Sequence, residues 1–300
     1  MSKWSYKMKG VIPPMITPFD QDGNVDEQAT RTLVRFLRDK VHGVFICGSY
    51  GCGPMMSVEE RKRVAEIVME EKGNLQVIVM VGTANTRDSV ELAVHARDIG
   101  CDAVSAVSPY YFHHNMNDVF GYYQDLINAV GPGYPVYIYT NPKFSGYPVD
   151  IKTIRRLQQI GLRGCKAASF DIMEYANMMR EFENDDFDVA LGTEALWLPA
   201  NIYGGEAFIP GLANAFPEIC CQMYEEAERG DYEACRKTQF KVNKIRDIMY
   251  LAPSTQLAIY AMLEIRGVIA AYPRKPFQPA TREQVDAIKA ELAKLGMLEA

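Results

Sequence analysis

The amino-acid sequence predicts a (β/α)8 barrel, the TIM-barrel form of an α/β protein, followed by a C-terminal helical extension. Eight short runs of apolar residues recur at intervals of about 25 to 30 residues, and longer amphipathic segments lie between them. Strands that alternate with helices form a parallel sheet covered by helices, and eight strands are the number that closes into a barrel. An open dinucleotide-binding sheet would carry G-x-G-x-x-G after its first strand, and this sequence has none there.

The predicted strands are short and rich in β-branched and aromatic residues, as buried parallel strands are. In chain order they are VIPPMI (11–16), GVFIC (43–47), LQVIVMV (75–81), DAVSAV (102–107), PVYIY (135–139), LRGCK (162–166), FDVAL (187–191) and EAFIP (206–210).

The segments between these strands read as helices, because apolar residues recur three and four positions apart. Residues 25–40 and 57–73 are two examples. Ser57 lies three positions before Glu60, which is the spacing of a capping box, and Gly73 and Gly100 follow segments that should end there.

The chain divides into a barrel over residues 1–220 and a helical extension over residues 221–300. Four amphipathic segments follow the last predicted strand, at residues 217–228, 231–249, 255–267 and 282–295. We expect these segments to pack on the barrel and not to form a separate catalytic domain.

Composition excludes several classes of protein. The net charge of −6 and the isoelectric point near 5.4 offer no basic surface for a nucleic-acid partner. No run approaches the length of a membrane-spanning helix, and the first residues lack the apolar core of a signal peptide. The seven cysteines are scattered and include no CxxC pair, so we expect reduced thiols in a cytoplasmic protein and no cysteine-bound metal.

Lys166 is the first candidate for chemistry, because active sites of such barrels lie at the carboxyl ends of the strands. It ends the sixth predicted strand and is followed by the small residues Ala167, Ala168 and Ser169. Burial at that position would lower the pKa of the amine, and a neutral lysine amine attacks carbonyl carbons. The sequence therefore suggests an imine between Lys166 and a 2-oxo acid.

Tyr139 and Ser49 fall at the same end of the barrel. Tyr139 ends the fifth strand, and its phenol could carry the protons that imine formation requires. Ser49 lies in the turn GSYG (48–51), where a hydroxyl and backbone N–H groups suit a carboxylate. Together with Lys166 they would form a site for a 2-oxo acid.

Eight segments in the same order resemble the dihydrodipicolinate synthase and N-acetylneuraminate lyase family of pyruvate-dependent class I aldolases. They are ITPFDQDGNVD (16–26), GSYG (48–51), VGTANT (81–86), SPYY (108–111), YTNP (139–142), GCK (164–166), LGTEALWLP (191–199) and GGEAFIPGLAN (204–214). The resemblance implies that Lys166 forms the Schiff base, that Tyr139 shuttles protons, and that Ser49 and Tyr50 bind the pyruvate carboxylate.

The same resemblance implies further residues and an assembly. Tyr111 would reach into the site of a neighbouring subunit and assist the proton relay, while Gly192 and Ile209 would line the pyruvate pocket. Family members are commonly homotetramers and need no metal or other cofactor. By their position after the seventh strand, Thr193 and Glu194 are candidate specificity residues, and Glu194 should disfavour an acidic distal group on the substrate.

The sequence also departs from the family pattern. Tyr50 stands where a second Ser, Thr or Asn is usual, and Cys52 replaces a Glu, which puts the usual hydroxyl relay in doubt. Phe144 occupies the position of the arginine that grips the second carboxylate in dihydrodipicolinate synthases, and Lys143 is the one cation beside it. A lysine-biosynthetic role is therefore disfavoured.

Several functions remain open at this point. The leading hypothesis is a carbon–carbon lyase acting on a 2-keto-3-deoxy sugar acid or a related compound. A dehydratase or hydratase-aldolase would use the same imine, and 4-hydroxy-tetrahydrodipicolinate synthase is the disfavoured alternative. A paralogue that only binds a 2-oxo acid would need neither Lys166 nor Tyr139. Adjacent His113 and His114 have no third ligand at a suitable spacing, so no metal site is expected.

Overall fold

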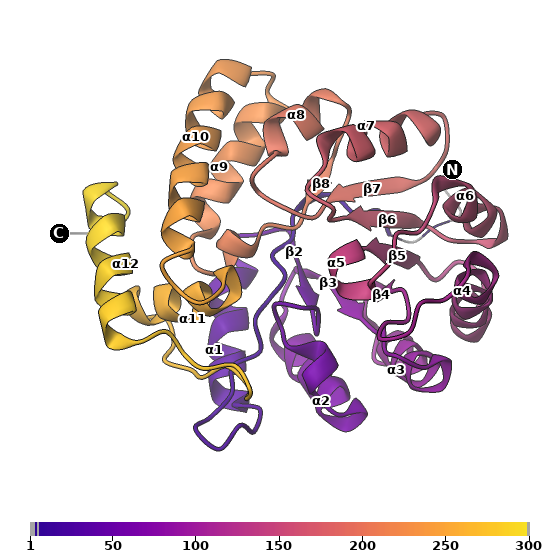
Figure 1. The fold of residues 1–300 in the computed structure, drawn as a ribbon, viewed down its shortest axis with the longest axis horizontal. Coiled ribbons are helices and arrows are strands. Elements are labelled where there is room, and N and C mark those ends of the chain that lie inside the picture. Colours follow the sequence, from indigo (N-terminus) through magenta and orange to yellow (C-terminus); the bar gives the residue numbers. More distant parts are fainter. Residues whose placement is uncertain (1–3, 5, 299–300) are drawn as a thin grey trace.

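Eight parallel strands form a barrel in the computed structural model, which describes residue 4 and residues 6–298. Neighbouring strands follow the order β1-β8-β7-β6-β5-β4-β3-β2, and helices surround them (Figure 1). The strands are β1 (Gly10–Val11), β2 (Gly43–Ile46), β3 (Gln76–Met80), β4 (Ala103–Val107), β5 (Val136–Thr140), β6 (Gly164–Ala167), β7 (Asp188–Leu191) and β8 (Ala207–Phe208). The predicted (β/α)8 fold is confirmed.

The ring closes between β1 and β2 through the prolines that follow β1. Pro14 bridges to Phe45, and the Phe45 N–H donates to the Pro13 carbonyl at 2.9 Å. Because proline has no N–H, these residues cannot supply every bond of a regular ladder. Strand β1 is therefore shorter than the predicted run 11–16.

The helices include all six segments for which the sequence predicts a helix by range. They are α1 (Glu27–Arg38), α2 (Val58–Glu71), α3 (Thr86–Asp98), α4 (Met116–Val130), α5 (Pro142–Ser145), α6 (Ile151–Ile160), α7 (Ile172–Glu181), α8 (Trp197–Ile202), α9 (Pro217–Glu228), α10 (Tyr232–Met249), α11 (Thr255–Ile265) and α12 (Arg282–Lys294), with 3-10 turns η1 (Gly53–Met55) and η2 (Gly211–Asn214). Ser57 and Glu60 form the predicted capping box, and Gly73 and Gly100 follow α2 and α3 with φ of 56° and 83°.

Polar groups buried at the amino end of the barrel close it. The Arg163 guanidinium, 1% exposed, pairs with the Asp188 carboxylate at 2.9 Å. The same carboxylate accepts hydrogen bonds from the Tyr137 hydroxyl at 2.7 Å and the Met8 N–H at 2.9 Å. Satisfied charges of this kind stabilise one arrangement of the strands.

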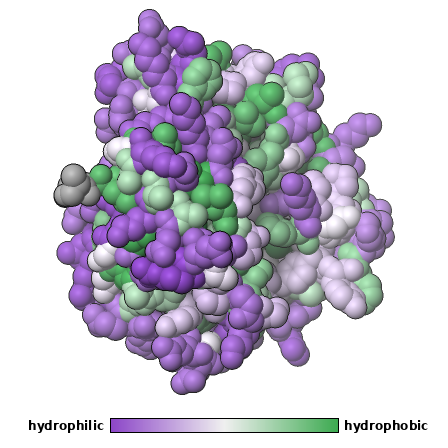
Figure 2. Space-filling model, turned by 60° about the vertical axis from the view of Figure 1, so that its left-hand side comes forward, coloured by the Kyte–Doolittle hydropathy of each residue, from purple (hydrophilic) through white to green (hydrophobic). Residues whose placement is uncertain are grey.

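The C-terminal helices cover the side of the barrel opposite α4 and α6 (Figure 1). Helix α10 packs on α8 and α9, and α11 packs on η2 and α12. The outer face of this region is largely hydrophilic with smaller apolar patches (Figure 2). The expected boundary between residues 220 and 221 falls inside α9, which also contacts β1. We propose that the barrel unit extends through α9.

No helix in the described part of the chain is both long enough and apolar enough to cross a membrane.

Candidate active site

Lys166 lies inside the barrel near its carboxyl end, on β6, and is 4% exposed. Its Nζ is 3.9 Å from the centre of the Phe45 ring and 4.0 Å from that of Tyr139. No hydrogen bond or ion pair reaches this amine from the residues that the structure describes. Burial without a compensating anion disfavours the charged form and lowers the pKa of Lys166 to about 7. An appreciable fraction of the amine is then a free nucleophile at neutral pH.

Tyr139 is the neighbour of Lys166 across the β5–β6 ladder. Its phenol oxygen accepts a hydrogen bond from Asn141 Nδ2 at 3.1 Å and interacts with the side chain of Ser49. Burial raises the pKa of Tyr139, and these two hydrogen bonds act in the opposite direction. The sequence left the hydroxyl relay in doubt because of Tyr50, but Ser49 supplies a hydroxyl beside the phenol.

The turn that follows β2 offers unused backbone donors. Within the described residues, the N–H groups of Ser49 and Tyr50 donate to no acceptor. Adjacent N–H groups of this kind form a concave site for an anion such as a carboxylate. The geometry is compatible with the predicted carboxylate site through backbone groups.

The Tyr50 side chain contacts the C-terminal extension. Its hydroxyl donates to Thr255 Oγ1 of helix α11 at 2.9 Å, and its ring lies against Gly211. A Cβ atom at Gly211 would lie 2.6 Å from the Tyr50 ring, so any larger residue there would displace the ring. Burial and the nearby Glu194 carboxylate raise the pKa of Tyr50, which keeps its proton on the hydroxyl. Tyr50 thus joins the barrel to the extension.

Gly192 follows β7 and its N–H donates to Ala167 of the Lys166 strand, while Ile209 follows β8 and its N–H donates to Leu191 of β7. A Cβ atom at Gly192 would be 2.4 Å from the Ala168 Cβ, so the strands could not approach this closely with any other residue. Ile209 is 1% exposed and belongs to the apolar cluster inside the barrel that includes Phe45 and Tyr139. Both residues can line a small binding site.

Glu194 is buried, and its carboxylate forms an ion pair with Arg246 of helix α10. The Arg246 guanidinium also lies 5.7 Å from the centre of the Phe170 ring. The prediction that Glu194 disfavours an acidic distal group depended on an uncompensated carboxylate, and the ion pair with Arg246 compensates that charge. Thr193 is also buried, and its Oγ1 accepts a hydrogen bond from the Ala195 N–H at 3.1 Å.

Three predicted residues lie on the surface of the isolated chain. Tyr111 is 86% exposed, has φ of 81°, and packs its ring edge-on against Phe112. Phe144 is 56% exposed, and exposed Lys143 places its Nζ 5.8 Å from the centre of the Phe170 ring. The structure therefore does not bring Tyr111 together with Lys166 of the same chain.

The histidine pair packs against an aromatic residue. His113 and His114 lie with their ring centres 5.8 Å and 6.3 Å from that of Tyr147. Among the described residues, no group of three or more His, Cys, Asp or Glu side chains has the arrangement of a metal site.

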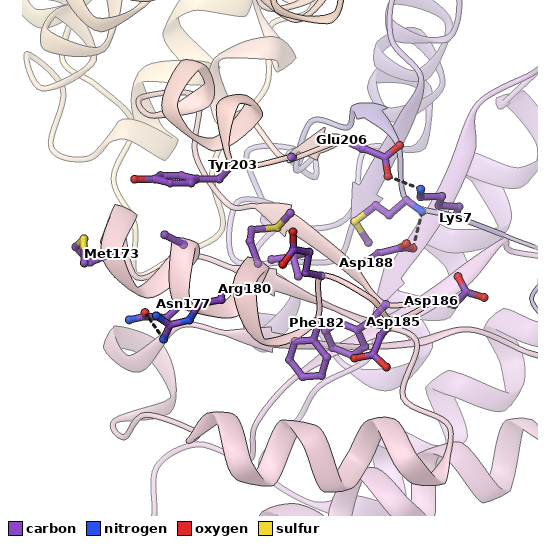
Figure 3. Close-up of a pocket in the computed structure, with 17 residues that line it drawn as sticks. Lys7, Met173, Asn177, Arg180, Phe182, Asp185, Asp186, Asp188, Tyr203 and Glu206 are labelled. Carbon is purple, nitrogen blue, oxygen red and sulfur yellow. Dashed lines mark hydrogen bonds and ion pairs between the residues drawn. The ribbon is translucent and has the colours of Figure 1, made fainter.

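The molecule has a cavity of about 670 Å³ (Figure 3), and Lys166 is not among the residues that line it. Its lining includes Arg180 of α7, Asp188 at the start of β7, and Glu206 just before β8. Glu206 pairs with Lys7, which also lines the cavity. These positions belong to the amino end of the barrel, where residues usually serve stability, and none of the predicted site residues lines the cavity.

Two polar residues near the site were not predicted from the sequence. Asn141 lies two positions after Tyr139 at the end of β5, and residues two apart on a strand share one face, so this spacing could have indicated it. Arg246 comes from the C-terminal extension, 52 residues after Glu194, and no local pattern links the two.

Comparison with known proteins agrees with this geometry. Residues 7–295 match the family described as the dihydrodipicolinate synthetase family. The chain is 33% identical over 287 residues to an N-acetylneuraminate lyase of Clostridium perfringens, covering 94% of this chain and 98% of that protein. It is 32% identical over 298 residues to a 4-hydroxy-tetrahydrodipicolinate synthase of Methanopyrus kandleri, covering 98% of each.

A solved structure of similar shape is a catalytic lysine mutant of the Ruminococcus gnavus sialic acid aldolase. It superimposes with a TM-score of 0.90 at 28% identity and covers 96% of this chain and 95% of that one. The chain belongs to the dihydrodipicolinate synthetase family, whose members are class I, Schiff-base-forming lyases and aldolases, as its motifs predicted.

Proposed function

We propose that this protein is a pyruvate-releasing carbon–carbon lyase that acts on a 4-hydroxy-2-oxo acid, such as a 2-keto-3-deoxy sugar acid. The observation that carries the proposal is the Lys166 amine, which is buried, free of any anionic partner within the described residues, and in contact with the Tyr139 ring. A buried cationic side chain without a partner costs stability, and such costs are typical of functional sites.

Imine formation would begin with attack of neutral Lys166 Nζ on the C2 carbonyl carbon, which gives a carbinolamine. The Tyr139 phenol would donate its proton to the carbinolamine hydroxyl, which leaves as water. Lys166 is then a protonated imine and Tyr139 a phenolate. The hydrogen bonds to the phenol oxygen support this step, because they stabilise the negative charge.

Bond cleavage would follow from the same two residues. The phenolate accepts the proton of the C4 hydroxyl while the C3–C4 bond breaks, and an aldehyde leaves. The bonding electrons move into the C2–C3 bond and neutralise the imine, forming an enamine. Protonation at C3 and hydrolysis of the imine then release pyruvate and restore Lys166.

The substrate's carboxylate would be held by the backbone N–H groups of Ser49 and Tyr50, with Gly192 and Ile209 beside the pyruvate part. Thr193 and Glu194 would face the distal part. Because Arg246 compensates the charge of Glu194, an acidic distal group is not excluded from the substrate. No cofactor is required, since the protein's own amine carries the substrate.

A substrate panel tests this proposal. Purified protein is incubated with 2-keto-3-deoxy sugar acids, including N-acetylneuraminate, and pyruvate release is measured. We expect release from at least one of them. In the synthetic direction, condensation of pyruvate with aspartate semialdehyde should be negligible, because Phe144 cannot bind a carboxylate. Robust synthase activity, or the absence of pyruvate from every sugar acid, would contradict the proposal.

We also propose that the protein is a homo-oligomer, most simply a tetramer, in which Tyr111 completes a neighbour's site. A tyrosine at φ 81° is strained, and its ring gains little from its own chain because it is 86% exposed. Contact with another subunit would account for both features. The seven cysteines are free, which fits the cytoplasmic location that we propose.

Replacement of Tyr111 by Phe distinguishes a proton relay from packing. If the hydroxyl takes part in catalysis, turnover should fall roughly 100-fold, while pyruvate still labels Lys166. If the ring only packs, turnover should stay near that of the wild type. Sedimentation of both proteins checks that the assembly is unchanged, and a fully active wild-type monomer would refute the shared site.

A further inference from the structure

Asn141 is placed where it could cap a helix, yet its side chain does not do so. It occupies the N-cap position of helix α5, and asparagine is among the residues favoured there. No side-chain hydrogen bond to the helix is formed. Instead, Asn141 is 7% exposed and its Nδ2 donates to the Tyr139 phenol oxygen at 3.1 Å. The amide is turned toward the candidate active site.

The oxygen of the same side-chain amide is in an energetically unfavourable position. Asn141 Oδ1 is buried and has no hydrogen-bond partner among the described residues. An unpaired buried acceptor destabilises a fold, and a residue kept only for structure would normally avoid it. The orientation of this side chain is therefore better explained by the phenol that it contacts than by folding.

We propose that Asn141 is a positioning residue for Tyr139, an inference that rests on the proposed function. Asn141 and Ser49 both interact with the phenol oxygen, which leaves the phenol's own hydrogen free for a third partner. Near the amine of Lys166, that partner is the carbinolamine hydroxyl. When the proton has been given away, the N–H of Asn141 stabilises the phenolate until it takes a proton back.

Pyruvate alone is sufficient to test this role. In heavy water, the imine of pyruvate loses a C3 proton to the Tyr139 phenolate and gains a deuteron, so deuterium enters the methyl group. Proton NMR measures the loss of the methyl signal. Asn141→Ala removes the donor, and Asn141→Asp keeps the size and the capping ability but replaces the donor by an acceptor with negative charge.

The order of the exchange rates in the two variants distinguishes a positioning role of Asn141 from a capping role. We expect exchange to fall roughly 10- to 100-fold in Asn141→Ala, the value of one hydrogen bond to a charged group, and further in Asn141→Asp. A capping role predicts the reverse order, with Asn141→Asp close to the wild type and Asn141→Ala impaired. Exchange at the wild-type rate in both variants would also overturn the inference.

Labelling of Lys166 by pyruvate and borohydride provides the control. It is measured well above pH 7, where Lys166 is neutral even if the new carboxylate raises its pKa somewhat. Both variants should still be labelled while exchange is slow. Loss of labelling together with a lower unfolding temperature would show that Asn141 only maintains the structure. A wild-type protein without labelling or exchange would refute the proposed function itself.

Discussion

Lys166→Ala protein should release no measurable pyruvate, with turnover lowered by about 10⁴-fold or more, because the nucleophile that carries the substrate is absent. Incubation of the wild type with pyruvate and borohydride should covalently label Lys166, which increases the mass of the peptide that contains it. The variant should show no such increase. The label should form faster as the pH rises through about 7, since deprotonation generates the attacking amine.

Two further variants test whether the loss of activity and the label are specific to the Lys166 amine. Lys166→Met fills the space beside Phe45 and Tyr139 without a charge, so it should unfold at no lower temperature than the wild type and still be inactive. Lys143→Ala removes an exposed lysine near Phe170 and should keep the label on Lys166. A label found on another lysine, or activity retained in Lys166→Met, would disprove the Schiff-base assignment.

Tyr139→Phe should lower turnover by roughly 10²- to 10⁴-fold, because it removes the hydroxyl that transfers protons. The substitution retains the ring that packs on Lys166 and lies edge-on to Phe45 at 6.0 Å. Labelling of Lys166 should therefore persist but become slower. Turnover and the rate of labelling are measured on the same preparation.

The unfolding temperature of Tyr139→Phe serves as its control, since the ring remains in place. If the variant is stable and turns over substrate at the wild-type rate, Tyr139 only packs against the lysine. The proton path would then have to use another group, and the inference about Asn141 would fail with it.

Membership of the family narrows the type of reaction more than it narrows the identity of the substrate. The chain is nearly as similar to a 4-hydroxy-tetrahydrodipicolinate synthase as to an N-acetylneuraminate lyase, with 32% and 33% identity. These two activities differ in the protein residues that contact the substrate beyond C3. Residues such as Phe144, Glu194 and Arg246 are therefore the ones that substrate assays must address.

The sequence by itself determined the fold and the positions of Lys166 and Tyr139 at strand ends. Eight apolar runs predicted eight strands, and the observed strands overlap every one of them. The spacing of apolar residues predicts these elements because a strand or a helix must bury one face or both. Lys166 and Tyr139 could be placed because the carboxyl ends of barrel strands meet at one face, so a position at a strand end already specifies the site.

Contacts between distant segments were decided only by the tertiary structure. Glu194 appeared as a free carboxylate in the sequence, but Arg246 of helix α10 neutralises it. From the sequence, Tyr50 could be placed only in the turn after the second strand, but in the structure its hydroxyl donates to Thr255, 205 residues away. Hydrogen bonds and ion pairs depend on distance and direction in space, and the packing of the C-terminal helices on the barrel sets both. No local pattern in the chain records them.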